Sequence, residues 1–142
     1  MIIIGIFISS FLLTELFAGL CHKYLMHGPL WKWHEDHHAP YSKEKLFQKN
    51  DRFFLVFAIP SMILGMTSYL TQNPLFLAAS MGLAVYGLVY FIVHDVYIHQ
   101  RFKLFQVIEN PYFRYIKKMH AIHHGVKKKE GSSRFGLLFP FF

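Results

Sequence analysis

The sequence has few charged residues and almost no capacity for disulfide bonds. Charged residues make up 16% of its 142 positions, whereas hydrophobic residues make up 54% and aromatic residues 18%. This balance is typical of a membrane protein rather than of a soluble domain. The single cysteine, Cys21, has no partner for an internal bridge, so a disulfide scaffold is excluded.

Two further features of the sequence narrow the possible functions. No glycine-rich dinucleotide motif is visible in the chain, so any redox chemistry needs electrons from outside. The formal net charge is +7, but the basic residues flank long apolar runs instead of forming a basic patch on a soluble fold. We therefore expect no nucleic-acid partner.

Three apolar segments, residues 2–20, 53–70 and 75–93, are each long enough, or nearly so, to cross a hydrocarbon core of about 30 Å. The first segment lacks the basic start and small-residue cleavage site of a signal peptide, so we expect a retained helix. The sequence predicts an all-α integral membrane protein in one unit, residues 1–142, with three transmembrane helices and room for a fourth, partial one.

Turn residues mark the ends of these helices. Residues 71–74 predict a tight hairpin, in which Asn73 caps the third segment and Pro74 fits its first turn. Residues 94–120 read as a mostly polar helical stretch that breaks near Asn110 and Pro111.

The second apolar segment has two further features, one at its start and one in its interior. Asn50 and Asp51 predict a capped start for it. Pro60 lies within it and is expected to bend the helix rather than end it.

The distribution of lysine and arginine predicts the orientation. The hairpin turn has none, whereas residues 21–52 and the region after residue 94 are rich in them. The basic residues of the first of these regions are Lys23, Lys32, Lys43, Lys45, Lys49 and Arg52. By the positive-inside rule, both basic regions face the cytoplasm, and the N-terminus and the hairpin turn face away from it.

The ten histidines all fall into four clusters with two repeated patterns. They are His22 and His27; His34, His37 and His38; His94 and His99; and His120, His123 and His124. Spacings of three or four place two imidazoles on one helix face, so His34 with His37 or His38 is set to chelate one metal. The same holds for His120 with His123 or His124. A spacing of five turns the second residue away on a regular helix, so the other two pairs need not share a metal.

The predicted topology brings all four clusters to the cytoplasmic membrane face, which favours one metal centre over scattered structural histidines. Ten imidazoles exceed the three or four ligands of one zinc ion, so two metals are indicated. Imidazole binds iron, copper, zinc and nickel alike, so the ligands do not choose the metal.

Carboxylates near the clusters are candidates for accepting hydrogen bonds from the metal-bound imidazoles. Glu15 is the strongest, because a carboxylate within a membrane helix is costly and lies on the helical face of His22. The alternative for Glu15 is a structural pair with a nearby hydroxyl. Asp95 is a second candidate, and a solvated or helix-capping role is its alternative.

Several strings in the chain resemble a known enzyme family. They are His22-Lys23-Tyr24-Leu25-Met26-His27-Gly28, Trp33-His34-Glu35-Asp36-His37-His38, His94-Asp95 with His99-Gln100-Arg101, and His120-Ala121-Ile122-His123-His124. The order and spacing of these clusters resemble the fatty acid hydroxylase and sterol desaturase superfamily, and the intervening residues are similar to its bacterial β-carotene hydroxylase branch. The likeness runs from about Glu15 to the end.

The resemblance implies a non-haem di-iron mono-oxygenase that uses dioxygen to hydroxylate carbon 3 of β-ionone rings, converting β-carotene through β-cryptoxanthin to zeaxanthin. It implies all ten histidines as iron ligands, with zinc able to replace iron in a purified sample. A bacterial inner membrane is the implied location. Rival interpretations are a fatty acid or sterol hydroxylase or desaturase, a carotenoid ketolase, and a non-catalytic metal-binding or transport protein.

The implied partners are the bilayer, a carotenoid and a ferredoxin-type electron donor. The donor would dock on the basic cytoplasmic face, which includes Lys117, Lys118, Lys127, Lys128 and Lys129. The substrate would approach along Tyr86, Tyr90 and His94, which recur every four positions, although helix packing also produces such a stripe. The apolar tail, residues 135–142, is expected to lie in the membrane interface or to cover the site.

Overall fold

A computed structural model describes residues 1–39, 47–102 and 110–141. All regular elements of these residues are helices. The main ones are α1 (Ile2–Cys21), α3 (Leu55–Thr71), α4 (Pro74–Tyr90) and α5 (Pro111–Gly125), with a short α2 (Trp31–His34) between the first two. Lys43 and Lys45 of the predicted basic loop, and part of the predicted helical stretch 94–120, lie outside the described residues.

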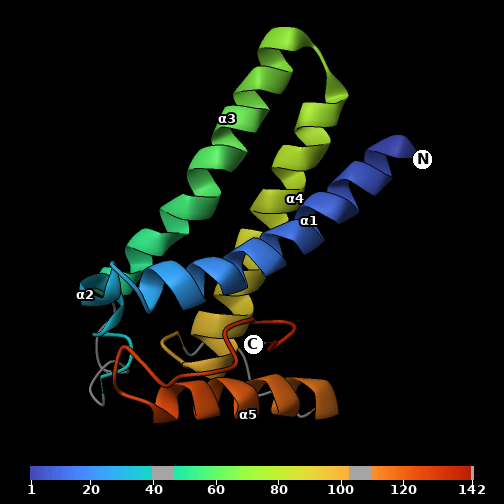
Figure 1. Cartoon of the computed structure of the whole chain (residues 1–142). Coiled ribbons are helices and arrows are strands. Elements are labelled where there is room, and N and C mark those ends of the chain that lie inside the picture. Colours follow the sequence, from blue (N-terminus) through green and yellow to red (C-terminus); the bar gives the residue numbers. More distant parts are fainter. Residues whose placement is uncertain (40–46, 103–109, 142) are drawn as a thin grey trace.

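Three helical stretches of the described residues are long and apolar enough to cross a membrane, as predicted: Ile2–Met26, Lys49–Thr71 and Pro74–Ile98. Many large apolar side chains on them point outward, including Leu13, Met62 and Leu70. Helix α5 is not one of these candidate spans and lies across the far end of the molecule (Figure 1).

Helices α3 and α4 form the predicted hairpin, which points away from α5 (Figure 1). The Asn73 side chain accepts a hydrogen bond from the backbone N–H of Leu75 at 3.0 Å, and Pro74 occupies the first turn. Lower in the hairpin, the buried hydroxyls of Ser61 and Ser80 each donate to the other residue's carbonyl oxygen, at 3.0 and 2.8 Å. These bonds satisfy polar groups that would otherwise face lipid.

The capping prediction for the second span is partly wrong. A 3-10 helix, Lys49–Phe54, precedes α3, and its N-cap is Gln48. Asp51 takes part as the third residue of a capping box, accepting from the backbone N–H of Gln48 at 3.0 Å. Asn50 instead turns its side chain to His34. Pro60 lies inside α3, which continues through it as expected.

Helix α1 crosses α4 at close range (Figure 1). Gly82 permits this contact, since an added Cβ would lie 2.7 Å from both the Phe7 carbonyl oxygen and the Ser10 Cβ. The lower ends of α1, α3 and α4 all lie on the side of the fold that faces α5 (Figure 1). Val93, Ile98, Ile116 and Leu137 form a small apolar core there, joining the end of α4 to α5 and to the C-terminal tail. Asn110 caps α5 and Pro111 starts it, so the predicted break is confirmed.

Candidate metal centre

The structure gathers the histidines into two buried groups at this lower end. Within each group the candidate ligand atoms all lie within 4.8 Å of one another. Group one contains His22, His27, His34, His38 and His123; group two contains His37, His94, His99 and His120. The groups adjoin, since the rings of His34 and His37 have centroids 5.4 Å apart. The prediction that all four histidine clusters of the sequence meet at one end of the fold is confirmed.

A wider helical turn explains why histidines five residues apart share a group. After Cys21 the chain continues as a π-helix, His22–Met26, in which the backbone N–H of His27 donates to the carbonyl of His22 at 2.9 Å. The bond from His99 to His94, also 2.9 Å, repeats this arrangement in the π-helix Phe91–Ile98. A bond between residues five apart places both side chains on one face, which a regular α-helix does not do.

The two H-x-x-H-H motifs each divide their histidines between the groups. His34 and His38 belong to group one, whereas His37 belongs to group two. In the second motif, His120 belongs to group two and His123 to group one. Each group thus consists of histidines from one half of the chain and one histidine from the other half. The centre therefore requires both halves to be folded together.

His124 lies beside group two. Its ring centroid is 4.5 Å from that of His120 and 4.7 Å from that of His37. It also stacks on His38 of group one at 4.3 Å. All ten predicted ligands are therefore present in one continuous cluster.

Every imidazole of group one has an oxygen facing its Nδ1 atom. The acceptors are the carbonyls of Phe135 for His22 (3.1 Å), Lys129 for His27 (2.9 Å), Val126 for His38 (3.0 Å) and Ser133 for His123 (2.9 Å), and the side-chain oxygen of Asn50 for His34 (2.6 Å). A carbonyl oxygen can only accept a hydrogen bond, so these Nδ1 atoms carry the proton. Each neutral ring then presents a lone pair at Nε2.

These Nε2 atoms point at one another. The Nε2 of His34 lies 2.9 Å from that of His22 and 3.1 Å from that of His38. The Nε2 atoms of His27 and His123 are buried with no hydrogen-bond partner in the described part of the chain. Lone pairs this close repel unless a cation lies between them, so the five rings fit a metal ion.

Group two has the same character. Gln48 accepts from the Nδ1–H of His37 at 2.8 Å, and the Nε2 of His37 lies 3.0 Å from that of His94. The Nε2 atoms of His99 and His120 approach to 2.8 Å. Four such nitrogens could hold a second metal ion.

Asp95, one of the two candidate carboxylates, lies beside His94 of this group. One carboxylate oxygen of Asp95 is 3.4 Å from the Nδ1 of His94, and the other accepts from Arg101. The Arg101 guanidinium also makes two bonds of 2.8 Å to the carboxylate of Asp51. This ion-pair network ties the start of the second span to the end of the third beside the metal ligands.

Burial keeps the imidazoles neutral. Together with the neighbouring imidazoles, it lowers the pKa of His38 to about 4 and that of His123 to about 3. The pKa values of His37 and His120 are held well below the usual range for the same reasons. Neutral imidazole is the form that binds a metal, so the cluster is suited to metal near pH 7.

Glu15 makes its contacts away from the imidazoles. Its carboxylate accepts from the hydroxyl of Tyr86 at 2.6 Å and from the backbone N–H groups of Leu138 and Phe139, both at 2.9 Å. These are the contacts of the alternative interpretation, a pair with a nearby hydroxyl. Glu15 is 1% exposed, so the three donors replace the water that a membrane helix denies it.

The C-terminal tail covers the metal centre, one of the two expected placements. The ring of Phe135 lies 5.4 Å from that of His22 and 5.1 Å from that of His123, centroid to centroid. Phe135, Gly136 and Leu137 are buried. The tail therefore supplies both an acceptor for His22 and an apolar cover over group one.

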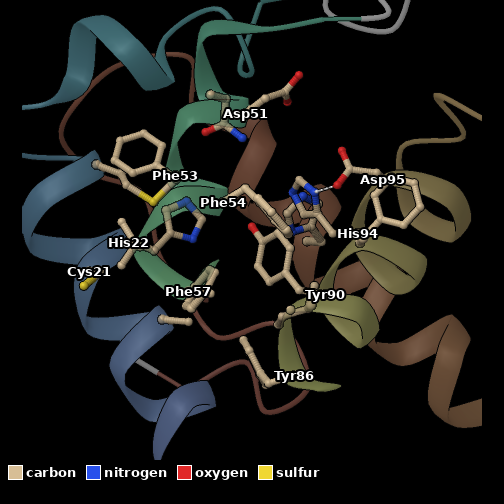
Figure 2. A pocket seen from close by; sticks show the side chains of 18 of the residues that line it. Cys21, His22, Asp51, Phe53, Phe54, Phe57, Tyr86, Tyr90, His94 and Asp95 are labelled. Carbon is tan, nitrogen blue, oxygen red and sulfur yellow. Dashed lines mark ion pairs between the residues drawn. The ribbon is translucent and has the colours of Figure 1, made fainter. Parts of the chain in front are cut away.

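An apolar cavity of about 290 Å³ ends at both groups. His22, the first residue of the π-helix that follows α1, lines it, as do His94 and His120 of group two. Figure 2 shows His22 and His94 on opposite sides of the cavity, with Tyr90 beside His94. Tyr86 and Tyr90 also line it, as the stripe along the third span predicts, although Tyr86 also packs against α1 and α3 through Phe11 and Phe57.

Sequence reasoning missed several supporting residues. Gln48 and Asn50 hold ligand rings, yet in the sequence they stand at a helix start and suggest only a cap. The one signal available in the sequence was that both residues follow a histidine motif. The carbonyls of Val126, Lys129, Ser133 and Phe135 leave no signal, because any residue type supplies a carbonyl oxygen.

Comparison with known proteins agrees with this geometry. The model of the fatty acid hydroxylase family matches residues 7–142. The chain is 36% identical to a β-carotene hydroxylase of Paracoccus sp. strain PC1, over 94% of this chain and 82% of that protein. It is 38% identical to one of Pantoea ananas over 88% of this chain and 70% of that protein.

A plant protein is also similar. A chloroplastic β-carotene 3-hydroxylase of Gentiana lutea is 34% identical over 80% of this chain and 36% of that protein. No solved structure gives a significant match. The family model covers nearly the whole chain and includes both histidine groups, so the chain belongs to the fatty acid hydroxylase family.

Proposed function

We propose that this protein hydroxylates carbon 3 of the β-ionone rings of β-carotene, giving β-cryptoxanthin and then zeaxanthin. The observation that carries the proposal is the apolar cavity that ends at His22 of one group and His94 and His120 of the other. A ring in this cavity would lie beside both groups. The similarity to bacterial and plant proteins named for this activity supports the choice of substrate.

Two iron ions, one in each histidine group, would activate dioxygen for attack on an unactivated C–H bond. The ten histidines would hold them, and neutral ligands leave their positive charge intact. Asn50, Gln48 and the backbone carbonyls hold the rings at fixed angles, so Nε2 points inward. Asp95 would partly balance the charge through His94.

The side chains around the cavity would exclude water and orient the ring. Phe54, Phe57 and Tyr90 enclose it with apolar surface, and the Tyr90 ring stacks on His94 at 4.8 Å. The charged residues of the wall, Asp51, Asp95 and Arg101, pair with one another, so the wall offers little to fatty acid carboxylates and other polar groups near the metals. The substrate is therefore held by shape, with little hydrogen bonding.

Electrons would come from a ferredoxin-type carrier on the cytoplasmic face. Lys118, Lys127, Lys128 and Lys129 are exposed at the end of α5 and in the following loop, and a positive surface attracts an acidic carrier. The same loop contributes the Val126 and Lys129 carbonyls that bind His38 and His27. A carrier docked there would lie next to group one. The protein would then lie in a bacterial inner membrane with its histidines on the cytoplasmic side.

Expression in bacteria that accumulate β-carotene tests the proposal. We expect 3-hydroxylated pigments without a keto group, identified by chromatography and mass. A variant with His37 and His123 both changed to alanine is the inactive control. If β-carotene stays unchanged while hydroxylated or desaturated fatty acids or sterols appear, the proposed substrate is refuted and the proposed metal centre is unaffected. Keto products would identify a ketolase.

A further inference from the structure

We propose that the polyene chain of the substrate lies in a groove between α3 and α4 that opens to the bilayer, and that Gly87 keeps this groove joined to the metal centre. This inference rests on the proposed function and specifies how the substrate is held. It differs from an approach along the stripe of Tyr86, Tyr90 and His94 alone, because Tyr86 is fully buried beneath the groove.

The groove and the metal-centre cavity are continuous. Phe54, Phe57, Gly87 and Phe91 line both. Two of these residues come from the start of the second span and two from the third, so the opening passes between the two helices. Figure 2 shows Phe54 and Phe57 beside the cavity that His22 and His94 border.

The groove is apolar and faces the region where lipid would lie. Beyond the shared residues it is lined by small and aliphatic side chains, including Ala58, Ala84 and Leu88. Its one hydroxyl, that of Ser61, already donates to the carbonyl of Ser80. Met62 and Leu88, on its two walls, are 73% and 57% exposed. A surface of this kind within two candidate membrane spans suits an apolar chain drawn from the bilayer.

The sizes of the cavity and of the groove indicate that the terminal ring of the substrate lies in the cavity and its polyene chain in the groove. A cavity of about 290 Å³ is at the lower end of the range for small ligands, so it takes one ring and not a whole carotene. The groove runs along the second span from Phe54, just before α3, to Met62, which is about 12 Å at about 1.5 Å per residue. A rigid polyene lying there would hold its terminal ring at the histidines.

Gly87 stands at the junction. A Cβ at this position would lie 3.9 Å from the Phe54 Cε2 and 3.9 Å from the Phe57 Cβ, which is ordinary contact. An alanine therefore fits, whereas a longer side chain would extend into the space between those rings. The small size of the residue at position 87 is what leaves the passage open.

Two substitutions test the groove. Gly87→Leu blocks the junction, and Ala84→Phe fills the groove farther from the metals at an exposed position that tolerates bulk. Gly87→Ala is the conservative variant, and Gly5→Leu is the matched control on α1, where nothing lies within 4 Å of an added Cβ. For each variant, conversion of β-carotene, pigment bound to the purified protein and metal content are measured.

We expect Gly87→Leu and Ala84→Phe to lower both conversion and bound β-carotene by about tenfold or more, with unchanged metal content, because a displaced ring loses its reacting geometry. Gly87→Ala and Gly5→Leu should stay within about twofold of the parent. Normal conversion in both bulky variants would overturn the groove and leave the proposed function intact. Pigment that binds to the parent and is lost in Ala84→Phe, without any conversion, would support the groove and refute the function. A parent protein that neither binds nor converts β-carotene would overturn both.

Discussion

The carboxylate of Glu15 accepts a hydrogen bond from the hydroxyl of Tyr86 at 2.6 Å, joining residues 71 positions apart in the chain. The bond connects α1 to α4 within the membrane-spanning part of the fold. The other carboxylate oxygen holds the backbone of Leu138 and Phe139. One buried acidic side chain thus connects two spans to the tail that covers the metal centre.

Changing Glu15 to Gln should preserve the fold and lower turnover. A neutral amide accepts the Tyr86 hydroxyl and the two N–H groups less strongly, a loss of about 1–3 kcal/mol in all. The tail should loosen, so the amides of Leu138 and Phe139 should exchange hydrogen faster. Glu35→Gln, an equal change of charge at an exposed position, is the control. Parent turnover and parent exchange in the Glu15 variant would leave that residue a packing role only.

Each histidine group contains one histidine from the opposite half of the chain. This arrangement predicts which metal ion each substitution removes. The parent should bind two metal ions per chain. His123→Ala removes a ligand from group one and His37→Ala removes one from group two, although each lies in the opposite half of the sequence. Each single variant should retain about one ion and lose turnover, because both metals serve one cavity. Metal analysis and the iron spectra of the two variants provide the measurement.

Cys21→Ala, next to His22 but outside both groups, is the control for that experiment and should retain two ions. One ion per chain in the parent would contradict the two-group centre. So would full activity of either histidine variant.

Asn50 should matter for metal binding rather than for helix capping. Asn50→Ala leaves the Nδ1–H of His34 without its acceptor at 2.6 Å, and loss of such a partner lowers metal affinity or activity by about 10–100-fold. Asn73→Ala is the matched control, since it removes the cap of α4 at the opposite end of the hairpin and costs about 1 kcal/mol of stability. Competition with a chelator measures the affinity. If the two variants bind the metal with equal affinity, Asn50 has only a structural role.

The sequence predicted the spans, the hairpin and the gathering of the histidines because these depend on local patterns. A run of apolar residues or a repeated histidine spacing is visible without knowledge of the fold. The sequence could not show that His22 and His27 lie in one group, because that depends on a π-helical turn for which the sequence offers no signal. The partner of Glu15 was equally hidden, since Tyr86 is brought near only by the crossing of α1 and α4.

The C-terminal tail has two roles, and truncation at two different positions can separate them. The carbonyl of Phe135 accepts from the Nδ1–H of His22, so this residue orients a metal ligand. The residues after Gly136 make no such bond to a histidine in the described part of the chain. They bind Glu15 through the N–H groups of Leu138 and Phe139, and the carbonyl of Leu138 accepts from the Tyr112 hydroxyl at 2.9 Å.

Ending the chain after Gly136 should therefore lower conversion while both metals remain, because the cover over the cavity loses its anchors and the ligands keep theirs. Ending it after Arg134 should lower metal content as well, because His22 then loses the acceptor that fixes its ring. Metal analysis and pigment conversion on both truncations, at equal protein levels in the membrane, measure the two effects. Equal metal content in both would mean that Phe135 only covers the site. Full conversion by the longer truncation would mean that residues 137–142 have no part in closing it.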